Sequence, residues 1–131
     1  MNRRSTPEAE AQRAIVQALR FALPRDAIVH HCANEVTEAG SRGQIRQSIL
    51  VGMGVHAGFA DLIVISGSRV LFLEVKSQTG RLRKAQEVFR DTVCAQGFGW
   101  ALVRSVDDAL AALADNGFTS RVRSPARRVA P

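Results

Sequence analysis

The segment DLIVISGSRVLFLEVK, residues 61–76, decides the fold of this chain. Two apolar runs, 61–66 and 70–76, flank the dipeptide Gly67-Ser68, which suits the two-residue turn of a β-hairpin. Both faces of both runs are apolar, so the hairpin is expected in the middle of a sheet that is covered on both sides.

A two-residue turn also fixes which residues of the hairpin face each other. If Ser66 pairs with Arg69, counting back along both strands places Asp61 directly opposite Glu74. Lys76 lies two residues beyond Glu74 and therefore on the same face. Two opposed carboxylates among apolar neighbours repel each other, and a divalent cation such as Mg²⁺ would relieve this repulsion. The hairpin thus predicts a metal site beside a lysine.

A simpler interpretation is that Asp61 only begins its strand, while Glu74 and Lys76 form an ion pair at a sheet edge. The apolar residues on both sides of the acids and their predicted juxtaposition favour the metal site. A cation there could bind a scissile phosphate and lower the pKa of a water molecule. Lys76 could position that water or stabilise the charge that develops on the phosphate.

A first helix is expected to begin near Thr6 and Pro7, where proline suits the first helical position. Its apolar stripe carries Ile15 and shares a face with Glu8, whereas Glu10 points away from that face. Glu8 could equally be an ordinary acid in the first turn, favoured by the helix dipole.

The remaining elements are a strand over 27–33, a helix over 82–96 with Gln86 on its inner face, a strand over 100–103 and a helix capped by Ser105. Residues 36–58 are rich in Gly, Gln, Ser and Arg and are expected to form a long loop or an irregular hairpin. The resulting order, α-β-β-β-α-β-α, predicts an α/β fold whose mixed central sheet is flanked by helices.

Composition limits the class of protein and the kind of partner. The 131 residues suit one compact domain, expected over 1–118, followed by a loose basic tail over 119–131. The net charge is +6 and 16 of the 18 basic residues are arginine, which favours a polyanionic partner, although an arginine-rich genome would give the same numbers. We find neither an apolar run of membrane-spanning length nor a signal-peptide h-region, so no membrane partner and a cytoplasmic location are expected.

The cysteines and histidines have ordinary interpretations. Cys32 and Cys94 show no paired spacing and are expected to be packed thiols, with neither a disulfide nor a metal between them. His30 and His31 are adjacent in a strand, so their side chains point to opposite faces and are expected to be ordinary strand residues.

Several of these runs together resemble a known family. The runs GFADLIVI (58–65) and LFLEVKSQTGRL (71–82), followed by Gln86 on the next helix, resemble the VRR-NUC family. These virus-type replication-repair nucleases are a branch of the PD-(D/E)xK phosphodiesterases. The resemblance extends from Glu8 to about Asp108. It departs at Ala60, where the superfamily often has a proline that shapes the strand entry and is not a ligand.

The resemblance implies a restriction-endonuclease-like αβββαβ core and a role for each site residue. The implied metal ligands are Asp61, Glu74, the Val75 carbonyl and Glu8; the implied catalytic residues are Lys76, Asp61, Glu74 and Gln86. The implied activity is that of a DNA endonuclease dependent on Mg²⁺ or Mn²⁺. Stand-alone members resemble Holliday-junction resolvases, which implies branched DNA (a four-way junction or a flap), a homodimer, and a DNA-repair role in a bacterial or phage-infected cell.

The sequence leaves three questions open. Candidate DNA contacts are Arg42, Arg46, Arg81, Arg83 and Lys84, but solvated loop and helix positions explain them equally well. Asn34 and Glu35 border the predicted site or simply form the exit of a strand. The alternative function is a non-catalytic nucleic-acid-binding or interaction module on the same fold. Nuclease domains that have lost their activity usually lack one of the acids or the lysine. This chain retains the acids and the lysine, which favours the enzyme.

Overall fold

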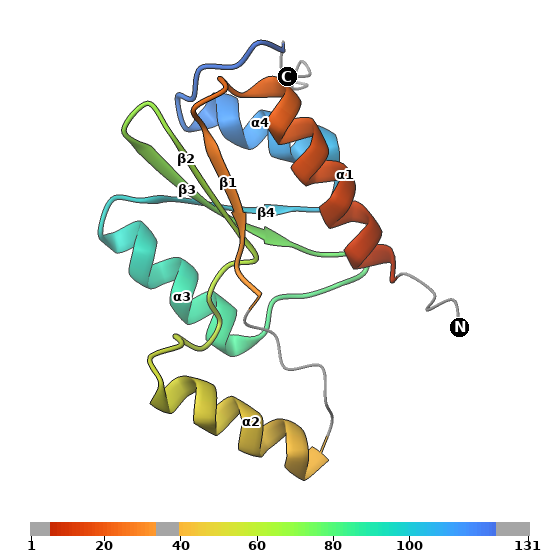
Figure 1. Cartoon of the computed structure of the whole chain (residues 1–131), viewed down its shortest axis with the longest axis vertical. Helices are drawn as coiled ribbons and strands as arrows, with labels where there is room; N and C mark the ends of the chain where they lie inside the picture. The colour runs from red at the N-terminus through yellow and green to blue at the C-terminus, as the bar shows by residue number, and fades with distance from the viewer. Residues whose placement is uncertain (1–5, 34–39, 123–131) are drawn as a thin grey trace, which may run out of the picture.

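The protein is a single mixed β-sheet with helices on both faces. The computed structural model describes residues 6–33 and 40–122. Its elements, in chain order, are α1 (Pro7–Ala22), β1 (Ile28–His31), α2 (Gly40–Gly52), β2 (Leu62–Ser66), β3 (Arg69–Val75), α3 (Lys84–Ala95), β4 (Gly99–Val103) and α4 (Val106–Asp115) (Figure 1). The strand order is β1-β2-β3-β4, antiparallel except for β4, which runs parallel to β3. The predicted fold class is confirmed, with one additional helix.

The β2–β3 hairpin has the predicted turn and register. Ser66 pairs with Arg69 and Ile63 with Phe72. Gly67 and Ser68 have φ values of +56° and +64°, as the tightest hairpin turns require. The ladder ends at the Leu62–Leu73 pair, one step short of the predicted pair between Asp61 and Glu74. At that step a side chain replaces a backbone acceptor, because Asp61 Oδ2 accepts the N–H of Val75 at 2.8 Å.

The main core lies between the sheet and the helix pair α1 and α4 (Figure 1). Ile15 and Leu19 of α1 and Leu113 of α4 are fully buried against the sheet. The sheet contributes Leu62, Val64, Leu71, Leu73 and Val75, which have no exposed surface. Burial of this many aliphatic side chains is the chief stabilising term.

The opposite face of the sheet is covered by α3 through an aromatic cluster. Phe89 of α3 packs edge-on against Phe72 of β3, with ring centroids 5.3 Å apart, and against Phe59 at 4.7 Å. The prediction that both central strands are covered on both faces therefore holds for β3 at Phe72, whereas Ile65 of β2 is 40% exposed on this side. The expected helix over 82–96 is slightly shorter, and Gln86 is buried on its inner face, as expected.

The prediction of a long loop or irregular hairpin over 36–58 is wrong for residues 40–52, which form α2. Its glycines have low helix propensity, so composition favoured a loop. The four-residue spacing of Ile45 and Ile49 is the helical signal within this stretch. Asn34 and Glu35 lie outside the described residues.

The chain after α4 returns to the end of α1. Arg121 N–H donates to the Ala22 carbonyl at 2.7 Å, and its guanidinium donates to the Phe21 carbonyl. The part of the predicted tail beyond residue 122 lies outside the described residues. Among the helices that the structure describes, none is long and apolar enough to cross a membrane.

Gly58 fixes the approach of α3 to the strand entry. Its φ is +75°, and a Cβ added there would lie 2.2 Å from the Ala85 carbonyl oxygen of α3. We expect Gly58→Ala to lower the free energy of unfolding by about 3 kcal/mol or more, through left-handed strain and overpacking together. Chemical denaturation would measure it.

The matched control for this change is Gly67→Ala, which shares a positive φ but has no atom within 4 Å of the added Cβ. It should cost only about 1 kcal/mol, the strain alone. Equal losses for the two variants would show that the close contact with α3 contributes nothing.

Candidate active site

Three charged side chains are buried together at one end of the sheet. Asp61 precedes β2, Glu74 lies near the end of β3, and Lys76 follows β3. Their exposed fractions are 4%, 1% and 6%. Buried charges destabilise a fold unless they are paired and hydrogen-bonded, so three of them together suggest a function beyond packing.

The two acids are held by different partners. Asp61 Oδ2 accepts the Val75 N–H, while the Asp61 carbonyl accepts the Cys32 N–H at 2.8 Å. Glu74 Oε1 lies 3.9 Å from the ammonium nitrogen of Lys76. The backbone therefore fixes Asp61, whereas side chains surround Glu74.

Gln86 connects the start of α3 to the buried acid. Its Nε2 donates to Glu74 Oε1 at 2.9 Å, and its Oε1 accepts the Arg83 N–H at 2.8 Å. Both ends of the amide are engaged, which sets its orientation. The sequence placed Gln86 on the inner face of this helix, and the structure brings it to Glu74.

The linker between β3 and α3 is held by Arg104, a residue that the sequence analysis did not single out. Its Nη1 donates to the carbonyls of Ser77 and Gly80, the latter at 2.8 Å. A Cβ at Gly80 would lie 3.4 Å from the Lys76 side chain, so the linker packs on that lysine. The only sequence signal for Arg104 is a cationic residue placed directly after a buried strand.

An open pocket of about 740 Å³ lies beside Lys76. It is lined by Thr6, Pro7, Glu8, Ala9, Gln12, Arg13, His31, Lys76, Ser77 and Arg83. Glu8 therefore reaches the same pocket as Lys76, whereas Glu10 is exposed outside it. His31 also lines this pocket, although its sequence context indicated only an ordinary strand residue.

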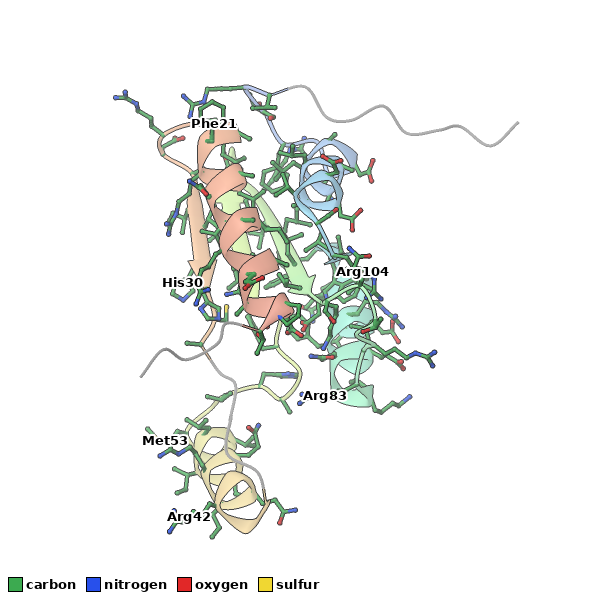
Figure 2. All side chains as sticks on the ribbon, turned by 90° about the vertical axis from the view of Figure 1, so that its right-hand side faces the viewer. Phe21, His30, Arg42, Met53, Arg83 and Arg104 are labelled. Atoms are coloured by element: carbon green, nitrogen blue, oxygen red, sulfur yellow. The ribbon has the colours of Figure 1, made fainter. Side chains whose placement is uncertain are left out.

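The structure separates the predicted nucleic-acid contacts into two groups. Arg83 lines the pocket, while Arg81, in the linker before α3, and Lys84, the first residue of α3, are exposed. Arg42 and Arg46 are on α2, whose far end carries Arg42 well away from the sheet (Figure 2).

The donor set suits a divalent cation of the Mg²⁺ type. Asp61 and Glu74 supply two buried carboxylates against one ammonium, that of Lys76, so the buried centre has an excess of negative charge. Oxygen ligands of this kind are those that Mg²⁺ prefers, and the hydrogen bond at Asp61 Oδ2 leaves lone pairs of that carboxylate for a metal. Within the described residues, however, no three His, Cys, Asp or Glu side chains cluster closely enough to form a complete ligand group.

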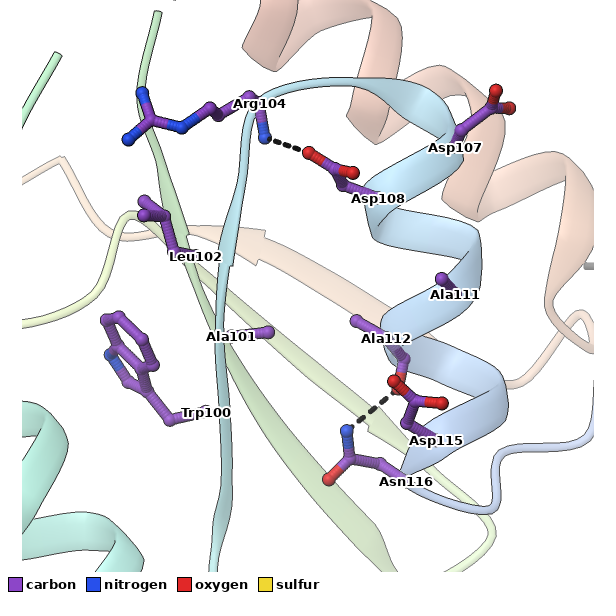
Figure 3. Close-up of a pocket in the computed structure, with 10 residues that line it drawn as sticks. All are labelled: Trp100, Ala101, Leu102, Arg104, Asp107, Asp108, Ala111, Ala112, Asp115 and Asn116. Carbon is purple, nitrogen blue, oxygen red and sulfur yellow. Dashed lines mark hydrogen bonds between the residues drawn. The ribbon is translucent and has the colours of Figure 1, made fainter. Parts of the chain in front are cut away.

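A second pocket, of about 570 Å³, lies between β4 and α4 (Figure 3). Asp107, Asp108 and Asp115 contribute acids to its lining. The Arg104 N–H donates to Asp108 Oδ2 at 2.9 Å, while its guanidinium turns away from α4 (Figure 3). Arg104 thus connects the start of α4 to the linker that packs on Lys76.

Comparison with known proteins gives a structural match only. No protein-family model and no curated protein matches the sequence. A solved structure described as a "VRR_NUC domain protein" matches with a TM-score of 0.63, covering 87% of this chain and 90% of that chain at 18% identity. The fold is VRR-NUC-like. The resemblance seen in the sequence is confirmed at the level of the fold, and the roles of individual residues stay predictions.

Within this VRR-NUC-like fold, the two cysteines differ. Both are free; Cys32 is buried, as expected, but Cys94 is exposed on the outer side of α3. Burial raises the pKa of the Cys32 thiol, and the nearby negative charge of Asp61 raises that pKa further.

This raised pKa predicts a reactivity order. At pH 8 less of Cys32 than of an ordinary thiol is thiolate, so iodoacetamide should alkylate Cys94 first, as peptide mass spectrometry would show. In a Cys94→Ser background, Asp61→Asn removes a cause that raises the pKa, so the pH midpoint for Cys32 alkylation should fall. An unchanged or higher midpoint would contradict the electrostatic contact between Asp61 and Cys32.

Proposed function

We propose that this protein is a metal-dependent endonuclease that hydrolyses phosphodiester bonds in DNA. The observation that carries the proposal is the convergence of Asp61, Glu74, Lys76 and Gln86, all buried, at one end of the sheet, where Lys76 also lines an open pocket. The VRR-NUC-like fold supports the same conclusion.

The proposed metal is Mg²⁺ or Mn²⁺, held by Asp61, Glu74, the Val75 carbonyl and Glu8. When bound, it would supply Lewis-acid polarisation of the phosphodiester and stabilisation of the charge that develops there. Glu8 would complete this set of metal ligands, because it lines the same pocket as Lys76.

The protein's own residues have separate tasks in this proposal. Lys76 presents an ammonium to the pocket, where it donates hydrogen bonds to the phosphate oxygens as negative charge builds up. Gln86 holds Glu74 in one orientation, and the Asp61–Val75 hydrogen bond fixes the strand end that carries both groups. The linker pinned by Arg104 limits the freedom of Lys76.

The finer substrate proposal is branched DNA, such as a four-way junction or a flap, cut by a homodimer. Cutting two symmetric strands requires two active sites, and the part of the chain that the structure describes holds one candidate site. The net charge of +6 favours a polyanionic substrate. Arg83 at the pocket rim, with Arg81 and Lys84 next to it, is positioned for phosphate contacts.

The alternative is a non-catalytic nucleic-acid-binding module on the same fold. The joint burial of Asp61, Glu74 and Lys76 argues against it, since burying charge costs stability and a surface that only binds DNA needs no such centre.

The chain contains two lysines, which provides a matched test of catalysis. We expect Lys76→Ala to reduce cleavage of four-way-junction, flap or linear DNA by about 100-fold or more with Mg²⁺ or Mn²⁺ present. Lys84→Ala removes the other lysine, which is exposed on α3, and should leave at least a tenth of the parent rate. Gel analysis of end-labelled DNA would measure both rates.

Two results would count against the proposal. If the parent cuts none of these DNAs with either metal, the protein is not the proposed nuclease. If Lys76→Ala and Lys84→Ala cut equally well, the site is placed wrongly.

Metal binding has a separate readout in thermal stability. A divalent cation that binds only the folded state raises the melting temperature by about 4 °C at ten times its dissociation constant. This increase should disappear in Asp61→Asn and Glu74→Gln, measured by calorimetry with MgCl₂ or MnCl₂ and no DNA.

The same measurement tests Glu8 against its neighbour on α1. Glu8→Gln should reduce the metal-induced increase, whereas Glu10→Gln, at an exposed position outside the pocket, should retain it. Equal increases in both variants would remove Glu8 from the proposed ligand set.

A further inference from the structure

Helix α2 exposes a face that combines arginines with large apolar side chains. Arg42, Ile45, Arg46 and Ile49 follow the i, i+3, i+4, i+7 spacing of one helix face, which Met53 extends. Ile45, Ile49 and Met53 are 61%, 58% and 80% exposed. Arg42 and Met53 lie on the same side of α2 (Figure 2). We call these five residues the α2 face.

The surroundings of α2 indicate that the α2 face binds a partner outside this chain. The helix has 13 residues and lies beyond α3, away from the sheet (Figure 1). Helices of this length are marginal in water without tertiary packing, and isoleucine and methionine are costly to expose in a cluster.

The charge of the segment favours a polyanion as the partner. Residues 40–60 contain Arg42 and Arg46 but neither Asp nor Glu. If two copies paired antiparallel through this face, Arg46 would lie opposite Ile49 of the other copy and Arg42 opposite Met53, so one contact would hold four arginines and no acid from residues 40–60. Like charges so close are unfavourable, whereas phosphates would pair with both arginines.

We propose that the α2 face binds DNA where bases are unstacked, as at a junction, a gap or a flap. This inference rests on the proposed function and specifies how its substrate is recognised. Arg42 and Arg46 contact phosphates on either side of the distortion. Ile45, Ile49 and Met53 pack against the exposed base faces.

An intact duplex would leave the apolar part of this face without a matching surface. Its outer surface is phosphate and sugar, and its base faces are covered by their neighbours. Proteins that insert isoleucine, leucine or methionine between base steps gain contact only where those steps are opened. The mixed chemistry of the α2 face therefore fits distorted DNA better than regular duplex.

The test measures binding alone, in EDTA, so that cleavage does not interfere. The full chain with Lys76→Ala is titrated against a four-way junction, a flap and a linear duplex of equal length and base composition, with fluorescence anisotropy as the readout. The same background then carries Ile45→Ser, Ile49→Ser, or both. The control is Val51→Ser, an exposed apolar residue on the other side of α2.

We expect the double isoleucine variant to bind the junction and flap at least tenfold more weakly and to bind the duplex within twofold of its parent. The Val51→Ser control should match its parent on all three DNAs. Arg42→Gln and Arg46→Gln should each reduce the slope of log affinity against log salt by about one unit on every DNA. Far-ultraviolet circular dichroism would establish that each variant is folded.

Two outcomes would overturn the inference. One is junction binding by the double isoleucine variant that equals the parent's. The other is a fall from dimer to monomer in light scattering with the same loss of affinity on all three DNAs, which would assign the face to a second copy. Failure of the nuclease proposal is distinguishable from both, because there the parent binds DNA and cuts none with metal present.

Discussion

The hydrogen bond between the Val75 N–H and Asp61 Oδ2 joins the two central strands at the end where the charged residues gather. It lies where the regular ladder stops, so a side chain completes the pairing that the backbone leaves unfinished. Asp61 is consequently fixed by the sheet itself, and the neighbouring Glu74 carboxylate is buried beside it. The positions of Glu74 and Lys76, on either side of Val75, follow from this strand end.

Glu74 is held by groups that arrive from elsewhere in the chain. Gln86 comes from α3 and Lys76 from the strand end, while Arg104, after β4, pins the linker between them. Such a network keeps buried charges in one geometry, and it holds them ready for an interaction with a positive ion or a phosphate. The stability lost by burying these charges is offset by the aliphatic core on the α1 and α4 side of the sheet.

How much of this was predictable depends on the distance over which each interaction acts. The hairpin follows from Gly67-Ser68 and the flanking apolar runs, and the face of α1 that carries Glu8 follows from helical spacing, because both are local properties. Arg104 was missed because its contacts with the linker join residues far apart in sequence. Helix α2 was missed because its glycines outweighed the spacing of its two isoleucines. The role of Asp61 as an acceptor for Val75 could not be foreseen, since alternation assigns faces but not hydrogen bonds between side chain and backbone.

The tight contact between Gly58 and the Ala85 carbonyl has a mechanical consequence. It holds the chain between α2 and Asp61 against α3, so this segment is fixed at Gly58 while α2 extends from it. Gly54, with φ at +107° and no atom within 4 Å of an added Cβ, lies between α2 and that contact. Rotation at Gly54 would let α2 follow the shape of a bound molecule, while Asp61, three residues after Gly58, keeps its place in the sheet.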